Sequence, residues 1–215
     1  MPNRYAEIAF TPSVKAAQTA EGSRAMMAAV EAAASGAAPL IGEDERLLIT
    51  TRDSFYQASV SETGWPYVQH KGGPPGFLKV LDERRIGYAD FRGNRQYVSL
   101  GNLAADARVC LFLVDYPSRL RLKILGRARG TTEPGEVEAL RVEGYRAVVE
   151  RGWVIDVEGL DWNCSRHITR RFSAHDVMQV VGPLQARVSE LEAELAALRG
   201  SSPSGGGVAE GDRGG

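Results

Sequence analysis

Between residues 47 and 131 the chain is a succession of short apolar runs separated by turn-forming residues, and this texture limits the folds open to it. Short β-forming runs at such spacing are typical of a sheet or barrel. The runs cover residues 47–51, 55–60, 66–71, 77–81, 85–90, 109–114 and 120–130. In the last run apolar and basic residues alternate, so Arg121 and Lys123 are expected together on the face away from the core.

Helices are expected on both flanks of this region, so the fold class we expect is mainly β with flanking helices (α+β). Thr11 and Pro12 have the residue types of an N-cap and a first helical position, and they open an alanine-rich region that runs to about residue 34. A second helix is expected over residues 95–104 and a third over 133–151. Two later runs, 153–157 and 177–181, are β-like.

Four parts are expected along the chain. Residues 1–40 form a helical covering segment and residues 41–182 the β domain. Residues 183–199 form an amphipathic helix, which could pack onto its own domain or onto a symmetry mate. Its apolar residues follow a 4-3-4-3 spacing: Leu184, Val188, Leu191, Leu195 and Leu198. Residues 200–215 hold seven glycines and almost nothing to bury, so we expect a disordered tail.

Composition excludes several classes of protein. Hydrophobic residues at 43% and charged residues at 25% are ordinary globular values, and two cysteines are too few for a disulfide framework. No stretch approaches the roughly 20 apolar residues of a membrane span, and the first residues lack the apolar core of a signal peptide. We therefore expect a cytoplasmic protein with reduced cysteines and no membrane partner.

The charge is unevenly distributed. The net charge of −1 argues against nucleic-acid binding, but residues 66–129 carry +7 and the remainder −8. A basic middle suits a compact anionic ligand such as a phosphate ester, and it equally suits a solvated basic face.

Familiar catalytic signatures are absent: there is no Rossmann fingerprint, Walker loop, nucleophile elbow or paired-cysteine zinc pattern. An anion site would therefore be built from strand side chains and one helix end. The strand 66–71 ends in Gln-His-Lys before glycines and prolines, and such an end can hold a planar heterocycle by its edge. Further on, Asn94 is expected to cap the helix over 95–104, with Arg95 and Gln96 on its first turn where a phosphate would bind. A capped helix with solvated polar residues is the alternative.

A polar cluster follows the run 153–157 and includes Asn163, Cys164 and His167. Buried amide and imidazole groups must find partners, so a ligand-facing role is expected for these residues. With three histidines in the chain and no matching partner motif, no metal site is expected.

Four ordered segments, residues 67–79, 89–97, 115–126 and 162–168, resemble the pyridoxamine 5′-phosphate oxidase-like flavin-nucleotide-binding proteins. The resemblance spans roughly residues 40–182. It implies a split β-barrel, a homodimer, and FMN bound in the groove between the subunits.

The resemblance also implies roles for single residues. Residues of one strand, and a pair of residues further along the chain, would line the edge of the flavin ring: Tyr67, Val68, Gln69, His70, Lys71, Ala89 and Asp90. Arg95 and Gln96, beside Asn94, fall where the oxidases hold the FMN phosphate. Gln96 stands in place of a lysine, and Lys123 is one cation that could substitute for it. Arg121 falls where a glutamine of the partner subunit reaches the flavin.

The expected function is that of a homodimeric FMN-dependent oxidoreductase acting on a small molecule, with NAD(P)H as a candidate reductant and deazaflavin as an alternative cofactor. His167, with Cys164 and Asn163, would line the open flavin face as the catalytic group. The oxidases' C-terminal pattern that receives pyridoxamine phosphate is missing, so vitamin B6 oxidation is not expected. Two alternatives are a flavin carrier or sensor without turnover, and a haem-binding relative on the same barrel.

Overall fold

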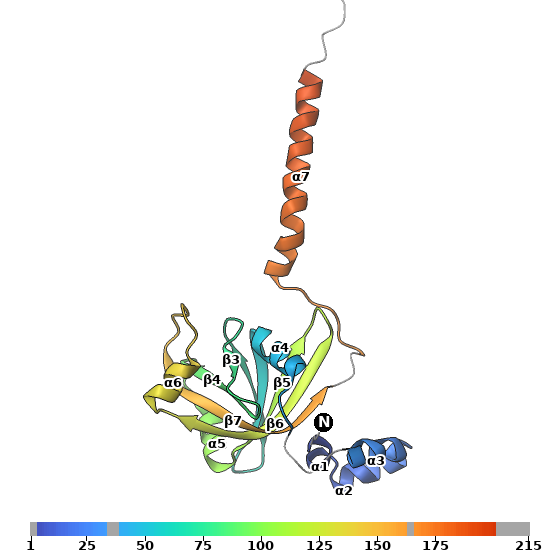
Figure 1. The fold of residues 1–215 in the computed structure, drawn as a ribbon, viewed down its shortest axis with the longest axis vertical. Coiled ribbons are helices and arrows are strands. Elements are labelled where there is room, and N and C mark those ends of the chain that lie inside the picture. The colour runs from blue at the N-terminus through green and yellow to red at the C-terminus, as the bar shows by residue number, and fades with distance from the viewer. Residues whose placement is uncertain (1–3, 34–38, 163–165, 201–215) are drawn as a thin grey trace, which may run out of the picture. The chain divides into compact units, whose positions relative to one another are not determined.

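The computed structural model describes residues 4–33, 39–162 and 166–200 (Figure 1). The chain divides into two compact units at Arg171, and each is considered by itself. The expected disordered tail from residue 201 onward lies outside the described residues. Within the described part of the chain, no helix is long and apolar enough to span a bilayer.

The first unit is built on one seven-stranded antiparallel sheet that curls strongly (Figure 1). Its strand order is β2-β1-β5-β6-β7-β4-β3. The strands are β1 (Ser54–Val60), β2 (Pro66–Gly72), β3 (Leu78–Val80), β4 (Arg85–Phe91), β5 (Arg108–Asp115), β6 (Leu120–Thr131) and β7 (Val149–Trp162). This confirms the expected fold class, a mainly β domain with flanking helices that forms a split barrel.

The helices are α1 (Tyr5–Ala9), α2 (Pro12–Ala20), α3 (Arg24–Ala33), α4 (Glu43–Thr51), α5 (Val98–Ala105), α6 (Pro134–Leu140) and α7 (Ala174–Gly200). Thr11 is the N-cap of α2, as expected, and its hydroxyl accepts a hydrogen bond from the Val14 amide at 3.4 Å. All of α7 belongs to the second unit.

The alternation expected near Arg121 is present. Leu122 and Ile124 are fully buried, and Arg121 and Lys123 lie on the other face of β6. We call that face, as it continues over β5, β1 and β2, the outer face of the sheet. Gly126 marks a bulge in the β6–β7 pairing, where a Cβ would lie 2.5 Å from the carbonyl oxygen of Asp156.

Curling brings β4 across to β1 and β2, although no ladder among the described strands joins them. The Lys71 ammonium of β2 lies 2.8 Å from the Asp90 carboxylate of β4. Deeper in, the Tyr88 hydroxyl of β4 donates to the Gln57 side-chain oxygen of β1 at 2.7 Å. These two polar contacts join strands from opposite halves of the sheet order.

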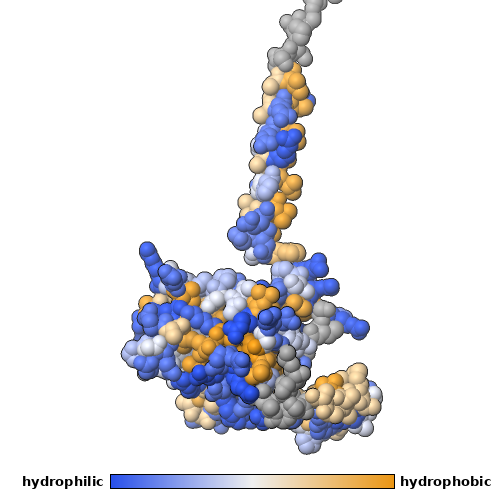
Figure 2. Space-filling model, in the orientation of Figure 1, coloured by the Kyte–Doolittle hydropathy of each residue, from blue (hydrophilic) through white to orange (hydrophobic). Residues whose placement is uncertain are grey.

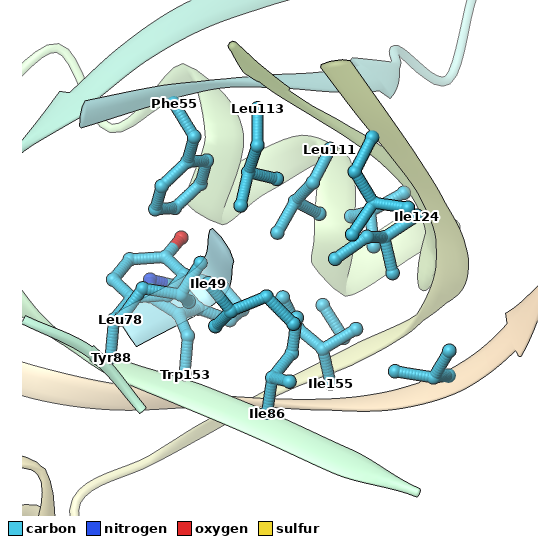
Figure 3. Packing of buried hydrophobic residues seen from close by; sticks show 14 of the residues in the cluster. Ile49, Phe55, Leu78, Ile86, Tyr88, Leu111, Leu113, Ile124, Trp153 and Ile155 are labelled. Carbon is cyan, nitrogen blue, oxygen red and sulfur yellow. The ribbon is translucent and has the colours of Figure 1, made fainter. Parts of the chain in front are cut away.

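The core fills the concave side of the sheet (Figure 3). The Phe55 ring lies 5.6 Å from the Phe77 ring and 5.3 Å, edge on, from the Tyr88 ring. Ile49 of α4 is completely buried in the same cluster. Burial raises the pKa of Tyr88 well above its ordinary value, so this phenol stays a neutral donor to Gln57.

Tyr88→Phe is expected to lower the free energy of unfolding by about 1–3 kcal/mol, because it leaves the buried Gln57 oxygen without its donor. Urea unfolding measures the change. Tyr145→Phe is the matched control: its ring keeps the contact with Phe91, and because Tyr145 is half-exposed, a change of less than about 0.5 kcal/mol is expected. Equal losses in the two variants would contradict the assigned role of the hydrogen bond.

Three expected elements are wrong. Residues 47–51 belong to α4 and not to a strand: three acidic residues open this helix, and the Gly42 amide donates to the Glu45 carboxylate at 3.0 Å. The helix expected over 133–151 ends at Leu140, and its last apolar residue, Val149, opens β7. Residues 177–181 are helical, because their valines belong to the long apolar stripe of α7.

Candidate functional site

A hollow that is partly open to solvent lies where β2, the end of β4, the start of β7 and the start of α5 converge. Its lining is mostly polar. The residues are Tyr67, Gln69, Lys71, Asp90, Phe91, Gly93, Asn94, Arg95, Gln96, Tyr97, Val98, Ser99, Leu100 and Glu150. Seven residues of the expected cofactor set, Asn94 among them, therefore lie around one hollow, and we call it the β2–α5 pocket.

The β2 strand divides its five expected residues between two faces. Tyr67, Gln69 and Lys71 line the pocket. Val68 and His70 point to the outer face, where the His70 ring contacts the Tyr56 ring edge on at 5.6 Å. Strand alternation is the reason, so Val68 and His70 can serve the pocket only through their backbone.

The pocket floor is held by ion pairs. Asp90 accepts from the Lys71 ammonium at 2.8 Å, and one of its oxygens lies 3.5 Å from the Arg151 guanidinium. Lys71 also lies 5.7 Å from the centre of the Tyr88 ring. Ala89, the other member of the expected pair, is buried in a separate apolar cluster with Leu140.

The loop before α5 differs from expectation. The helix begins at Val98, not at residue 95, and Asn94 is not its cap. The Asn94 side chain instead accepts from the Gln96 amide at 3.1 Å, and Arg95 and Tyr97 are both left-handed, with φ of 62° and 54°. This local turn delays the helix, because left-handed residues cannot continue it.

Arg95 and Gln96 are thus exposed loop residues beside the start of α5. Tyr97 occupies the N-cap position without a side-chain hydrogen bond to the helix, so the first amides of α5 keep no local cap. The Arg95 guanidinium donates to the Tyr97 hydroxyl at 3.4 Å, and this bond, with the nearby Glu150 charge, raises the pKa of Arg95. The mouth of the pocket therefore combines a permanent cation with open amides.

Two pocket residues, Tyr97 and Glu150, were missed by the sequence reasoning, and so was Arg151, which contacts the pocket residue Asp90. The Glu150 carboxylate accepts hydrogen bonds from Arg92 at 3.0 Å and from the Tyr97 hydroxyl at 3.2 Å. Both bonds lower the pKa of Glu150, and the bond from Arg92 has the larger effect. Arg151 lies 5.5 Å from the centre of the Tyr97 ring. Glu150 and Arg151 were missed because residues 149–151 open a strand inside the segment expected to be helical.

Arg121 and Lys123 do not join the pocket of their own chain. The Lys123 ammonium lies 3.5 Å from Asp161 and 3.3 Å from the Tyr5 hydroxyl. The Arg121 Nε is buried and finds no hydrogen-bond partner among the described residues.

Of the expected catalytic residues, Asn163 and Cys164 lie outside the described residues. His167 is exposed in a turn, with a left-handed φ of 63°, and it does not line the β2–α5 pocket. Among residues 4–33, 39–162 and 166–200, no cluster of three or more His, Cys, Asp or Glu side chains could hold a metal ion.

Three solved structures illustrate the likeness to known proteins. HupZ of Group A Streptococcus is 18% identical with a TM-score of 0.49, covering 62% of this chain and 100% of its own. An FMN-binding protein of Syntrophomonas wolfei subsp. wolfei is 11% identical with a TM-score of 0.45, covering 55% and 83%. A Clostridium acetobutylicum protein related to general stress protein 26 is 14% identical with a TM-score of 0.44, covering 62% and 94%. None is close enough to assign an activity.

Comparison with the curated proteins finds no match. The model of one protein family, described as pyridoxamine 5′-phosphate oxidase, matches residues 41–169. That segment is more than half of the 215 residues, and it contains every strand of the curled sheet together with the β2–α5 pocket. The chain therefore belongs to the pyridoxamine 5′-phosphate oxidase family.

Proposed function

We propose that the chain is a homodimeric FMN-dependent oxidoreductase that acts on a small molecule, with FMN held in the β2–α5 pocket at the interface between two copies. The observation that carries the proposal is the mouth of this pocket, where the exposed Arg95 lies beside the open amides of α5.

The residues present fit the phosphate of FMN. Arg95 and the first amides of α5 would bind it, and the side-chain amide of Gln96 can add an uncharged donor. Around the pocket, four cations face two carboxylates: Lys71, Arg92, Arg95 and Arg151 against Asp90 and Glu150. The surplus positive charge favours a dianionic group.

The ring edge would lie along β2. This strand is at the edge of the sheet and pairs only with β1 among the described strands, so half of its amides and carbonyls are open to a heterocycle. When bound, FMN supplies the two-electron redox chemistry. Lys71 would hold a positive charge near the ring and favour negative charge there, while Asp90 and Gln57 with Tyr88 keep this side of the pocket rigid.

The outer face supports the homodimer. Tyr56 and Phe112 lie opposite each other on β1 and β5, and Ala58 lies opposite Cys110. Tyr56 is 42% and Val68 is 61% exposed, an apolar sheet surface of the kind that marks protein interfaces. Arg121 is on the same face, from which it would reach the pocket of the second copy.

The absorbance spectrum of the purified protein, with mass identification of the released cofactor, tests the proposal. A flavin spectrum and the mass of FMN are expected. A Soret band would replace the proposal by the haem-binding alternative. Steady-state assays with NADH, NADPH and oxygen then separate an oxidoreductase from a carrier or sensor, for which bound FMN would show no turnover.

His167 lies outside the pocket of its own chain, so in this proposal it reaches the flavin bound to the second copy. His167→Asn is then expected to leave FMN bound and to slow flavin reduction or reoxidation by about tenfold or more, because the variant cannot exchange a proton at that position. Stopped-flow absorbance measures both half-reactions. His175→Asn, on α7, is the matched control and is expected to change neither. Unaltered rates in His167→Asn would remove His167 from the proposed catalytic group.

A further inference from the structure

The helix α7 carries a stripe of exposed apolar side chains that nothing in the proposed function uses. Figure 2 shows hydrophobic side chains along one side of this 27-residue helix and hydrophilic ones along the other. The uninterrupted part of the stripe follows Pro183 and consists of side chains that are 46–69% exposed: Leu184, Val188, Leu191, Leu195 and Leu198. A long helix with such a face is stabilised mainly by covering it.

We propose that α7 pairs with α7 of a second copy of this chain as a parallel, in-register, two-stranded coiled coil. The 4-3-4-3 spacing places Val181, Val188 and Leu195 at heptad positions a, and Leu184, Leu191 and Leu198 at positions d. Two of the three a positions hold β-branched valines and all three d positions hold leucine, a combination that favours two parallel strands. The stripe therefore fits another copy of itself.

Charges beside the stripe independently favour the parallel arrangement. Arg187 and Glu194 occupy g positions, and Glu192 and Arg199 occupy e positions. In a parallel pair each g residue faces the e residue five positions further along the other helix. Arg187 then faces Glu192, and Glu194 faces Arg199, so every such pair is attractive.

An antiparallel pair would be less complementary. In that arrangement a layers face d layers, g residues face g residues and e residues face e residues. Arg187 then meets Glu194 of the other copy, which is attractive. Glu192, however, meets the uncharged Gln185, and Arg199 meets Met178. Within its own helix Arg187 lies 2.9 Å from Glu190, a surface pair that contributes little and does not prevent an interhelical contact.

Breaks in the helix lie away from the stripe. Gly182 and Pro183 occupy outward b and c positions, and from Leu184 to Leu198 there is no further glycine or proline. Two heptads are short for an isolated coiled coil, so a second contact between the same two chains would strengthen the pairing by raising its effective concentration. The barrel dimer proposed above would be such a contact, but the test below reads α7 directly.

Disulfide formation in full-length protein tests the arrangement. In a background with Cys110→Ser and Cys164→Ser, Leu184→Cys at a d position is expected to cross-link to itself in a glutathione buffer about tenfold faster than Ala186→Cys, which points away from the stripe. In the antiparallel register the two Leu184 positions are separated by about 16 Å along the axis, which a disulfide cannot span.

Each result decides the proposal. Fast cross-linking of Leu184→Cys alone supports it. Cross-linking between Leu184→Cys and Leu195→Cys chains, without self-linking, would establish the antiparallel pair and overturn it. Equally slow reaction of Leu184→Cys and Ala186→Cys would show that α7 does not pair with itself, and packing onto its own domain would take its place. Sedimentation at a mass above a dimer would overturn the two-stranded state.

A charge swap supplies the second test. Glu192→Arg, in the Leu184→Cys background, sets arginines against each other and is expected to reduce cross-linking severalfold, and Arg187→Glu added to it is expected to restore the yield. Residues 187 and 192 are separated by about 140° around one helix, so they cannot pair within a chain, and rescue must come from the second copy. Failure of the double variant to recover would contradict the proposed register.

Discussion

Arg95→Ala is expected to weaken FMN binding about ten- to hundredfold, because it removes the cation nearest in the chain to the open amides of α5 and would leave one side of the phosphate without a charge-assisted bond. Quenching of FMN fluorescence on titration of the apoprotein measures the dissociation constant. The effect is expected to be large because the neighbouring Gln96 cannot replace a guanidinium charge.

Arg84→Ala is the matched control: it removes a surface arginine from the turn between β3 and β4, away from the pocket lining, and is expected to leave FMN affinity unchanged. Arg95→Lys separates charge from geometry and is expected to recover part of the affinity. If Arg95→Ala and the parent chain bind FMN equally well, the phosphate does not lie at the mouth of the β2–α5 pocket.

Where local pattern and burial agree, the sequence predicts this fold well. The alternation from Leu120 to Ile124 sets which face of β6 is buried, and the pairing of β6 with both β5 and β7 preserves it. The hairpin between β1 and β2 forms where Gly64 takes a φ of 84°. At these positions the local backbone geometry and the packing of the core favour the same type of residue.

The errors arise where a short apolar run has two possible periods. Leu47 to Thr51 could be a strand by composition, but the acidic first turn and the burial of Leu48 and Ile49 on one side make it helical. Near residue 149, apolar residues of a loop and of β7 imitate a helical stripe. Local reasoning cannot separate these cases, because tertiary packing decides them.

The site was predictable in its residue types and less so in its geometry. Lys71 and Asp90 were both in the expected set, but their 2.8 Å contact exists only because the sheet curls until β2 and β4 meet. Glu150 and Arg151 enter for the same reason, from a strand that starts far along the chain. Long-range closure of this kind leaves no local signal, whereas the alternation that sends His70 away from the pocket could have been inferred.

The outer face leads to the second large effect. Phe112→Glu is expected to weaken self-association of a chain ending at Arg170 by about a hundredfold or more, because it places a carboxylate at the centre of an apolar interface. In a single copy the residue faces outward, so the fold is expected to persist, as circular dichroism would show. Analytical ultracentrifugation measures the dissociation constant.

Met26→Glu is the control for this variant: it charges an exposed apolar side chain on α3, away from β1 and β5, and is expected to leave the dimer intact. If the β2–α5 pocket is completed by a second copy, Phe112→Glu should lose FMN together with the dimer, whereas Arg95→Ala should lose FMN and remain a dimer. If the parent chain ending at Arg170 is already monomeric, the barrel does not self-associate. The dimer contact of the full-length protein would then lie in α7 alone.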